Sequence, residues 1–190
     1  MTLTEFNRLL AAKRKELDHL MRHTLPVKVG AMAKAHYQDN IRERQGFLNG
    51  GLHKWQKTKR QMSGGKSAAS NYGALQSSRM HLYSSLKYVP SAYRVKVSND
   101  LKYAPVHNWG GTVQPTVTPK MRKWAWAKHY EEAGADKKKD TPWKRLALTK
   151  KSKLNIRIPQ RQFLGESREL NEQIQQKMDS EVRNILNKEE

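Results

Sequence analysis

The side chains most able to do chemistry in this chain are His107 and Asn108, which stand beside the glycine pair Gly110 and Gly111. A histidine at a tight backbone corner can serve as the base that activates a nucleophile. The chain has no cysteine, and none of its serines stands in the strained elbow motif of a hydrolase. We therefore expect His107 to pack or form hydrogen bonds at the end of a strand, and we expect no enzymatic activity.

Signatures for phosphate, metal and acid–base chemistry are incomplete. The run Gly64 to Ser67 resembles the end of a phosphate-binding loop, but the glycine four residues earlier and a preceding apolar strand are missing. The seven histidines are scattered without metal-ligand spacing. Only Glu43 and Asp100 are acidic between residues 42 and 102. The sequence therefore predicts no cofactor and no metal site.

The composition favours one domain over residues 1–190 with a small core. The hydrophobic fraction is 36% and the mean hydropathy is −0.93, so much of the surface must face solvent or a partner. No run of about 18 apolar residues occurs, and we expect no membrane partner.

The charge is strongly positive and unevenly distributed. Lys and Arg number 37 against 17 Asp and Glu, a formal net charge of +20. Residues 117–161 hold 14 basic and 4 acidic groups, whereas residues 162–190 hold 4 and 7. Such a distribution attracts polyanions. Either an acidic face of one copy meets a basic face of the next, or the basic surface faces DNA.

Basic and aromatic residues together are the candidates for contact with a neighbouring subunit or with DNA: Trp55, Lys137, Lys138, Lys139, Trp143, Lys144, Arg145, Lys150 and Lys151. Cations interleaved with tryptophans could neutralise phosphates and stack on bases. The alternative, which we favour, places the aromatic residues in the core or a subunit contact and the lysines on a solvated face. No module that reads nucleic acid accompanies the charge.

The apolar spacing predicts several helices. An amphipathic helix is expected over 3–22. A second helix should follow, with Thr24 as its cap and Pro26 in its first turn, and run to about Arg44. Further helices are expected over 75–86 and 120–133. Ser167 should cap a final helix. The residues expected to face inward are Val27, Ala31, Ala35 and Ile41 in the second helix, and Leu170, Ile174, Met178, Val182, Ile185 and Leu186 in the last.

The remaining segments indicate strands and long basic loops. Strands are expected over 93–97, 101–107 and 156–163, the first two joined as a hairpin at Asn99 and Asp100. Residues 112–117 should form either a third strand or an extended arm. Residues 46–73 and 134–155 should be extended or flexible loops. Within the first, Trp55 should dock on the core or on another protein. The predicted fold class is α+β, a small and largely antiparallel sheet of about four strands packed against the N-terminal and C-terminal helices.

Two short segments identify the chain better than any catalytic signature. YAPVHNWGGTV (residues 103–113) and IRIPQRQFLG (residues 156–165) resemble the "IHNFGG" and "IPARPFLG" signatures of bacteriophage virion morphogenesis and tail completion proteins. Gln162 departs from the second signature, where a second proline is common. The positions that match are Ala104, His107, Trp109, Gly110 and Gly111, then Pro159, Arg161, Phe163, Leu164 and Gly165.

The resemblance implies a structural role in a virion, with assembly in the host cytoplasm. It implies a subunit of a homo-oligomeric ring, about six subunits in size, between the portal-bound connector or adaptor and the tail terminator or tube. In the motifs we expect Gly110 and Gly111 to turn the chain, Trp109 and Phe163 to supply buried aromatic area, and Arg161 to bind a carboxylate in the fold or on an adjoining copy.

Overall fold

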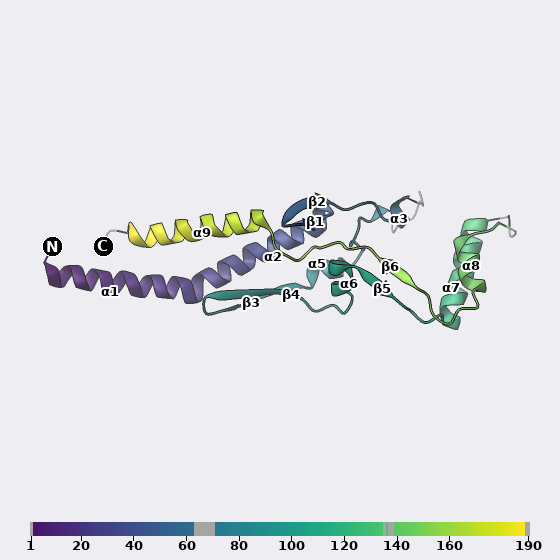
Figure 1. The fold of residues 1–190 in the computed structure, drawn as a ribbon, viewed down its shortest axis with the longest axis horizontal. Coiled ribbons are helices and arrows are strands. Elements are labelled where there is room, and N and C mark those ends of the chain that lie inside the picture. The colour runs from purple at the N-terminus through teal and green to yellow at the C-terminus, as the bar shows by residue number, and fades with distance from the viewer. Residues whose placement is uncertain (1, 63–70, 135, 137–138, 189–190) are drawn as a thin grey trace. The chain divides into compact units, whose positions relative to one another are not determined.

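The computed structural model describes residues 2–62, 71–134, 136 and 139–188 (Figure 1). These residues form helices and small antiparallel sheets, which confirms the α+β class. Their strands pair as three two-stranded sheets, so the prediction of one sheet of about four strands is wrong. The chain divides into two compact units. Unit 1 contains residues 1–109 and 160–190, and unit 2 contains residues 110–159.

Unit 1 begins with a long helical run. α1 (Leu3–His19) leads through a π-helical turn, η1 (Leu20–Thr24), into α2 (Leu25–Glu43). At the start of α1 the Thr2 hydroxyl accepts a hydrogen bond from the N–H of Glu5, and the Glu5 carboxylate accepts one from the N–H of Thr2. This reciprocal cap satisfies two N–H groups that a helix start otherwise leaves free.

The predicted break between the first two helices is wrong. Thr24 has helical dihedral angles, and its side chain makes no capping bond. In the π-helical turn the N–H of Leu25 donates to the carbonyl of Leu20, five residues back, so the chain stays helical as it enters Pro26. The turn therefore replaces the corner that the proline indicated.

α2 buries only one of the four residues predicted to face inward. Ile41 is fully inaccessible, as expected, and it is buried together with Leu25 and Ala33 at helical spacing. Val27, Ala31 and Ala35, which were expected to face inward, are exposed. The buried face of α2 instead carries the hairpin described next, against which Gly30 packs so closely that a Cβ there would lie 2.2 Å from the ring of Tyr88.

The hairpin beside α2 consists of β3 (Leu86–Ser91) and β4 (Arg94–Asn99). β4 confirms the strand predicted over 93–97, but its partner precedes it in the chain. Residues expected to form the partner, 101–107, lead instead into helix α6 (Ala104–Trp109). The Asn99 side-chain oxygen accepts the N–H of Leu101 at 3.1 Å, which ends the strand in a turn. The short helix predicted over 75–86 is limited to α5 (His81–Ser84), because Leu86 already belongs to β3.

The core of unit 1 draws on four parts of the sequence that lie far apart along the chain. Its buried members are Ile41, Leu82, Leu86, Ala104 and Phe163. Burying such side chains contributes roughly 1.5–3 kcal/mol each, so the contribution from these few is modest for a chain of this length. Unit 1 therefore depends on hydrogen bonds between its segments as well as on apolar burial.

The loop expected over 46–73 is in part regular structure. β1 (Gln45–Leu48) and β2 (Gly51–Lys54) form a hairpin, and α3 (Lys59–Met62) follows. Asn49 and Gly50 form its two-residue loop with φ angles of 51° and 76°, as a type I′ turn requires. The Asn-Gly pair was the available signal for this hairpin. Residues 63–70 lie outside the described part of the chain.

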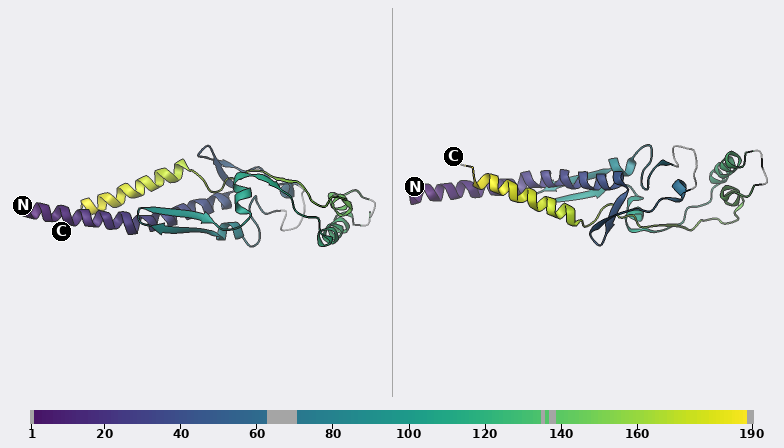
Figure 2. Two further views of the ribbon diagram at one scale, coloured as in Figure 1. Left: turned by 60° about the horizontal axis from the view of Figure 1, so that its bottom comes forward. Right: turned by 90° about the horizontal axis from the view of Figure 1, so that it is seen from above.

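The last helix of unit 1 confirms the predicted helix and its serine cap, but not the whole of the predicted inward face. Of the six residues expected to face inward, only Leu170 is buried, and Leu186 is 56% exposed. α9 (Arg168–Leu186) is capped by Ser167, whose hydroxyl accepts the N–H of Leu170 at 3.2 Å. It runs alongside the N-terminal helical run in the opposite direction, as the views of Figures 1 and 2 agree. Lys13 donates to the carbonyls of Ile185 and Lys188, at 2.9 and 2.8 Å, which places a cation at the C-terminal end of α9.

Unit 2 is a two-stranded ribbon that carries a helical hairpin. β5 (Gly111–Val113) pairs antiparallel with β6 (Ile156–Ile158), and a bridge between Thr116 and Lys153 extends the ribbon. α7 (Pro119–Ala133) confirms the helix predicted over 120–133, and Gly134 ends it with a φ of 57°. α8 (Pro142–Leu148) lies within 134–155, so the expectation of a loop there is wrong for these residues.

The two helices of unit 2 pack through small and polar side chains. Ala125, His129 and Thr141 have at most 1% of their surface exposed, and Nδ1 of His129 lies 2.9 Å from Oγ1 of Thr141. The Thr141 hydroxyl also caps α8. Arg122 donates to the carbonyls of Ala147 and Thr149, which ties α7 to the end of α8. That one domain spans residues 1–190 stays a prediction.

Candidate functional site

The two signature segments meet in unit 1 at the side chain of Asn108. Its Oδ1 accepts hydrogen bonds from the N–H groups of Phe163 and Leu164, at 3.0 and 2.9 Å, and its Nδ2 donates to the carbonyl of Leu164 at 3.0 Å. The carbonyl of His107 accepts the N–H of Arg161 at 2.8 Å. Asn108 is 5% exposed. A buried amide needs partners, and here the backbone of the second signature supplies them.

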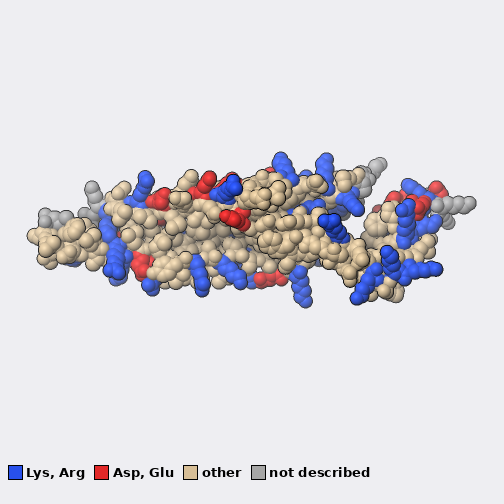
Figure 3. Space-filling model, in the orientation of Figure 1, with Lys and Arg blue, Asp and Glu red and all other residues tan. Residues whose placement is uncertain are grey.

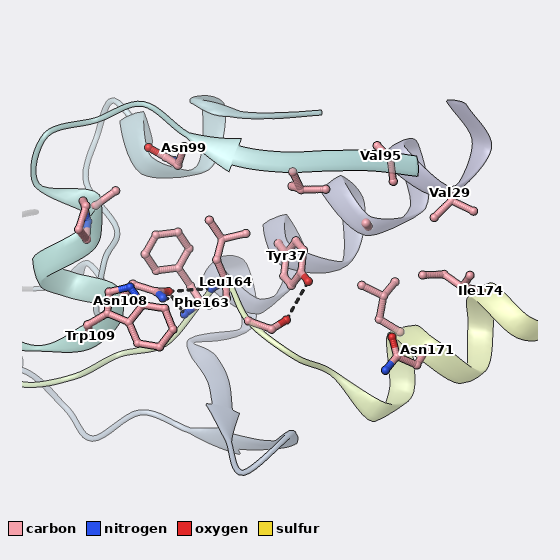
Figure 4. A pocket seen from close by; sticks show the side chains of 16 residues that line it. Val29, Tyr37, Val95, Asn99, Asn108, Trp109, Phe163, Leu164, Asn171 and Ile174 are labelled. Atoms are coloured by element: carbon pink, nitrogen blue, oxygen red, sulfur yellow. Dashed lines mark hydrogen bonds between the residues drawn. The ribbon is translucent and has the colours of Figure 1, made fainter. Parts of the chain in front are cut away.

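Other parts of unit 1 hold the same segment, residues 161–165, on its remaining sides. The N–H of Phe47 in β1 donates to the carbonyl of Gln162 at 2.8 Å. The Tyr37 hydroxyl of α2 donates to the carbonyl of Gly165 at 2.8 Å, one of the dashed bonds in Figure 4. Phe163 between them has no exposed surface. Segment 161–165 is therefore fastened to α2, β1 and α6 at once.

The close approach of β1 to segment 161–165 depends on Gly46. A Cβ at this position would lie 2.0 Å from the carbonyl oxygen of Gln162 and 2.6 Å from Nε1 of Trp55. The carbonyl belongs to the backbone and cannot swing aside. Only glycine lets the two backbones come this close.

The structure places the remaining signature residues in different surroundings. Gly110 and Gly111 have φ angles of 73° and 154°, values that glycine adopts readily, as they lead into β5. Pro159 is exposed after β6. Trp109 is 63% exposed, so the expectation that it supplies buried aromatic area is wrong. Asn108, which performs the clamping, was not among the candidate structural residues. The feature that could have indicated this role is its position: Asn108 is a short polar residue between two candidate structural residues of the first signature, His107 and Trp109.

His107 and Arg161 are close enough to influence each other. Burial lowers the pKa of His107, and the positive charge of Arg161 lowers it further. Burial also lowers the pKa of Arg161. Within the described residues no carboxylate lies within ion-pair distance of the Arg161 guanidinium, so the fold itself does not supply the expected partner.

An apolar groove of about 550 Å³ lies beside the clamp. In Figure 4, Val95 of β4 and Ile174 of α9 face each other across it, with Val29 of α2 beside them. Trp109 and Phe163 line its other end. The groove leaves apolar side chains of three elements only half-buried.

The candidate contact residues divide between the two units. Trp55 belongs to unit 1, where it packs against the core and its Nε1 is buried. Trp143 meets Trp124 edge to face at 5.0 Å, and Arg145 pairs with Asp140 at 2.5 Å. Lys139, Lys150 and Lys151 are exposed, and Lys144 is half-buried. Lys137 and Lys138 lie outside the described residues.

Two searches of the described residues bear on other kinds of site. They contain no helix long and apolar enough to cross a membrane. They also contain no group of three His, Cys, Asp or Glu side chains placed to hold a metal ion.

Comparison with known proteins agrees with the signature segments. Residues 3–183 match the Phage virion morphogenesis family. The chain belongs to that family. The match includes both units and the whole Asn108 clamp. No curated protein and no solved structure matches the chain. Membership supports a role in building a phage particle, as a protein associated with the virion and with other virion proteins.

Proposed function

We propose that this protein is a non-enzymatic structural subunit that completes a phage tail or the joint between head and tail. The observation that carries the proposal is a difference between the two units in what their side chains contact. In unit 1 the signature residue Asn108 fastens the backbone of the second signature with three hydrogen bonds. Unit 2 instead exposes several lysines and two large aromatic side chains, Trp124 and Tyr130. Family membership supports the role in morphogenesis.

The outward side chains of unit 2 are suited to binding another macromolecule. Lys120 and Lys123 are exposed on α7, and Trp124 and Tyr130 on the same helix are 48% and 53% exposed. Figure 3 shows Lys and Arg side chains projecting around α7 and α8. Large exposed aromatic side chains are costly in solvent and are common where partners bind. In this proposal unit 2 reaches a neighbouring subunit of a homo-oligomeric ring, a hexamer in the simplest case, or the connector, terminator or tube beside it.

A trimmed variant tests this role. The carbonyl of Pro115 accepts the N–H of Leu154 at 3.0 Å, so the two strands are in register at these residues. Replacing residues 116–153 by Asn-Gly would close the ribbon as a type I′ hairpin. We expect the trimmed protein to keep a cooperative unfolding transition, because unit 1 retains its core, and to fail in complementing a phage that lacks the gene. Infectious particles at the normal yield from the trimmed protein would overturn the proposal.

A second candidate function, binding of DNA by an accessory protein, is favoured by the pairing of lysines and exposed aromatics on α7. The variant with Lys120, Lys123, Lys150 and Lys151 all changed to Gln tests it against the assembly role. DNA binding predicts a duplex shift at about 50 mM salt that weakens steeply with added salt and is lost in this variant. The absence of any shift at that salt concentration would reject DNA binding and leave the assembly role standing.

A further inference from the structure

A second recess in unit 1 is lined by hydrogen-bond donors and by two arginines, and no acidic residue lines it. It has a volume of about 390 Å³, and we call it the Arg161 pocket. Its lining residues are Thr58, Arg60, Leu75, Gln76, Ser77, Leu82, Tyr103, His107 and Arg161. Two guanidinium groups, three hydroxyls, an amide and an imidazole therefore surround a floor that includes two leucines. None of the lining residues is Asp or Glu.

Hydrogen bonds hold the guanidinium of Arg60 and the backbone of Arg161 in place. The Arg60 guanidinium donates to the carbonyls of Tyr72, Gly73 and Gln76, at 3.2–3.4 Å, and lies over the ring of Tyr72. The backbone of Arg161 is fixed by its bond to the carbonyl of His107. A fixed guanidinium presents a planar pair of donors and loses little freedom when an anion binds.

Two groups in the Arg161 pocket lack partners among the described residues. The guanidinium of Arg161 has no carboxylate within ion-pair distance, although burial disfavours its charge. Nδ1 of His107 is buried and makes no hydrogen bond. Residues 63–70, outside the described part, contain no acidic residue that could reach them. Arg161 is half-buried. A partly desolvated cation without a counter-charge costs free energy, and an anion from outside the chain would recover it.

We propose that the Arg161 pocket receives a carboxylate side chain from an adjoining virion protein. The Arg161 fork would bind both carboxylate oxygens, with Arg60 and a nearby hydroxyl completing the contact. A carboxylate suits the site better than a DNA phosphate. A side chain can enter a recess with an apolar floor, whereas duplex phosphates lie on the outside of a wide and rigid helix. This proposal rests on the assembly role, because the partner is another subunit of the particle.

The first test is binding by the full-length protein. The probes are an acidic tetrapeptide of Asp and Glu with blocked termini, the same peptide with Asn and Gln, inorganic phosphate, and a short DNA duplex. We expect the acidic peptide to shift the NMR signals of the Arg161 Nε–H group and the His107 ring in a saturable way. The amide peptide should bind at least about tenfold more weakly, because it lacks the charge that strengthens such bonds.

Arg161→Gln and Arg157→Gln form a matched pair of variants. Each removes one arginine, but Arg157 is exposed in β6 and does not line the Arg161 pocket. We expect Arg161→Gln to lose binding of the acidic peptide and Arg157→Gln to keep it. Arg161→Gln should unfold at the same denaturant concentration as the natural protein or a higher one, since it removes a desolvated charge with no partner. A large loss of stability would instead assign Arg161 a structural role.

The remaining outcomes separate this proposal from the assembly role. Binding of phosphate or duplex but not of the acidic peptide would overturn the carboxylate assignment in favour of a phosphate. If no probe binds, the proposal that the Arg161 pocket receives an anion is rejected. If Arg161→Gln is stable and complements a phage that lacks the gene, the pocket proposal fails while the assembly role stands. Complementation by the trimmed variant would reject the assembly role and leave the peptide measurement intact.

Discussion

The side-chain oxygen of Asn108 lies 2.9 Å from the backbone nitrogen of Leu164, 56 positions later in the chain. The same oxygen also binds the N–H of Phe163, and the amide nitrogen of Asn108 returns a bond to Leu164. The buried Asn108 side chain thus makes hydrogen bonds to Phe163 and Leu164 that a neighbouring strand would otherwise make. It is the link through which the second signature rejoins unit 1 after the excursion through unit 2.

Replacing Asn108 by Ala should destabilise the protein by about 2–5 kcal/mol. The change leaves the buried N–H of Phe163 without its partner, at a cost of roughly 1–3 kcal/mol. It also removes the partner of the half-buried N–H and carbonyl of Leu164, at a smaller cost for each because water can reach them. Chemical unfolding followed by far-UV circular dichroism measures the loss. Asn155→Ala, on an exposed side chain of unit 2, is the control and should change the free energy of unfolding by less than about 0.5 kcal/mol. Equal stability of the two variants would contradict the clamp.

Two glycines of the β1–β2 hairpin should respond in opposite ways to alanine. In Gly46→Ala the new Cβ would lie 2.0 Å from the Gln162 carbonyl, so the bond from Phe47 must break, at a cost of about 3 kcal/mol or more. In Gly51→Ala the nearest atom is 3.6 Å away, and the change should be neutral or stabilising by up to about 1 kcal/mol. Soluble yield and unfolding midpoints distinguish them. Similar midpoints for both variants would refute the predicted close approach.

Stability should fall as the solution becomes more acidic through the histidine range. Burial lowers the pKa of both His36 and His107 below the ordinary value of 6.5. Below that value the unfolded chain therefore binds protons that the folded chain resists, so the free energy of unfolding decreases as the pH drops from about 7. Unfolding at a series of pH values tests this. The double variant His36→Gln with His107→Gln should show a flatter dependence, and an unchanged slope in that variant would contradict the prediction.

Ser167→Ala should cost about 1–2 kcal/mol. It removes the cap of α9 and the contact of the Ser167 hydroxyl with Nε2 of His36 at 3.0 Å. Thermal unfolding measures the effect. Ser180→Ala, in the exposed part of the same helix, is the matched substitution and should leave the transition nearly unchanged. A transition as high in Ser167→Ala as in Ser180→Ala would contradict the capping role.

The elements with strong local signals were predictable from the sequence. α9 combines a serine cap with a regular apolar stripe, and α7 ends at a glycine, so both were expected close to their observed bounds. The first two helices were harder. Pro26 indicated a corner, but a π-helical turn, which leaves no clear mark in sequence, carried the chain through it.

The strand errors have a physical cause as well. Tyr93 takes a φ of 62° in the turn between β3 and β4. Glycine or asparagine at this position would have predicted a turn, but a tyrosine did not. Pro90 lies within β3, although proline is unusual inside a strand. It is tolerated because it sits opposite Val95 in a two-stranded hairpin, where an N–H pointing away from the partner is not needed.

The candidate site was predictable in its parts and not in its connections. Both signatures were recognised, but nothing in their spacing says that an asparagine in one holds the backbone of the other. The environment of Arg161 was left open between a partner in the fold and one on another copy. Such questions depend on which segments meet in space, which a single sequence does not encode locally.

The paired ends of unit 2 make its length adjustable. Gly111 faces Ile158 across the ribbon, so the excursion leaves and re-enters at neighbouring points. Adding or removing residues in opposed pairs would change how far the tip extends while every bond at the base stays in place.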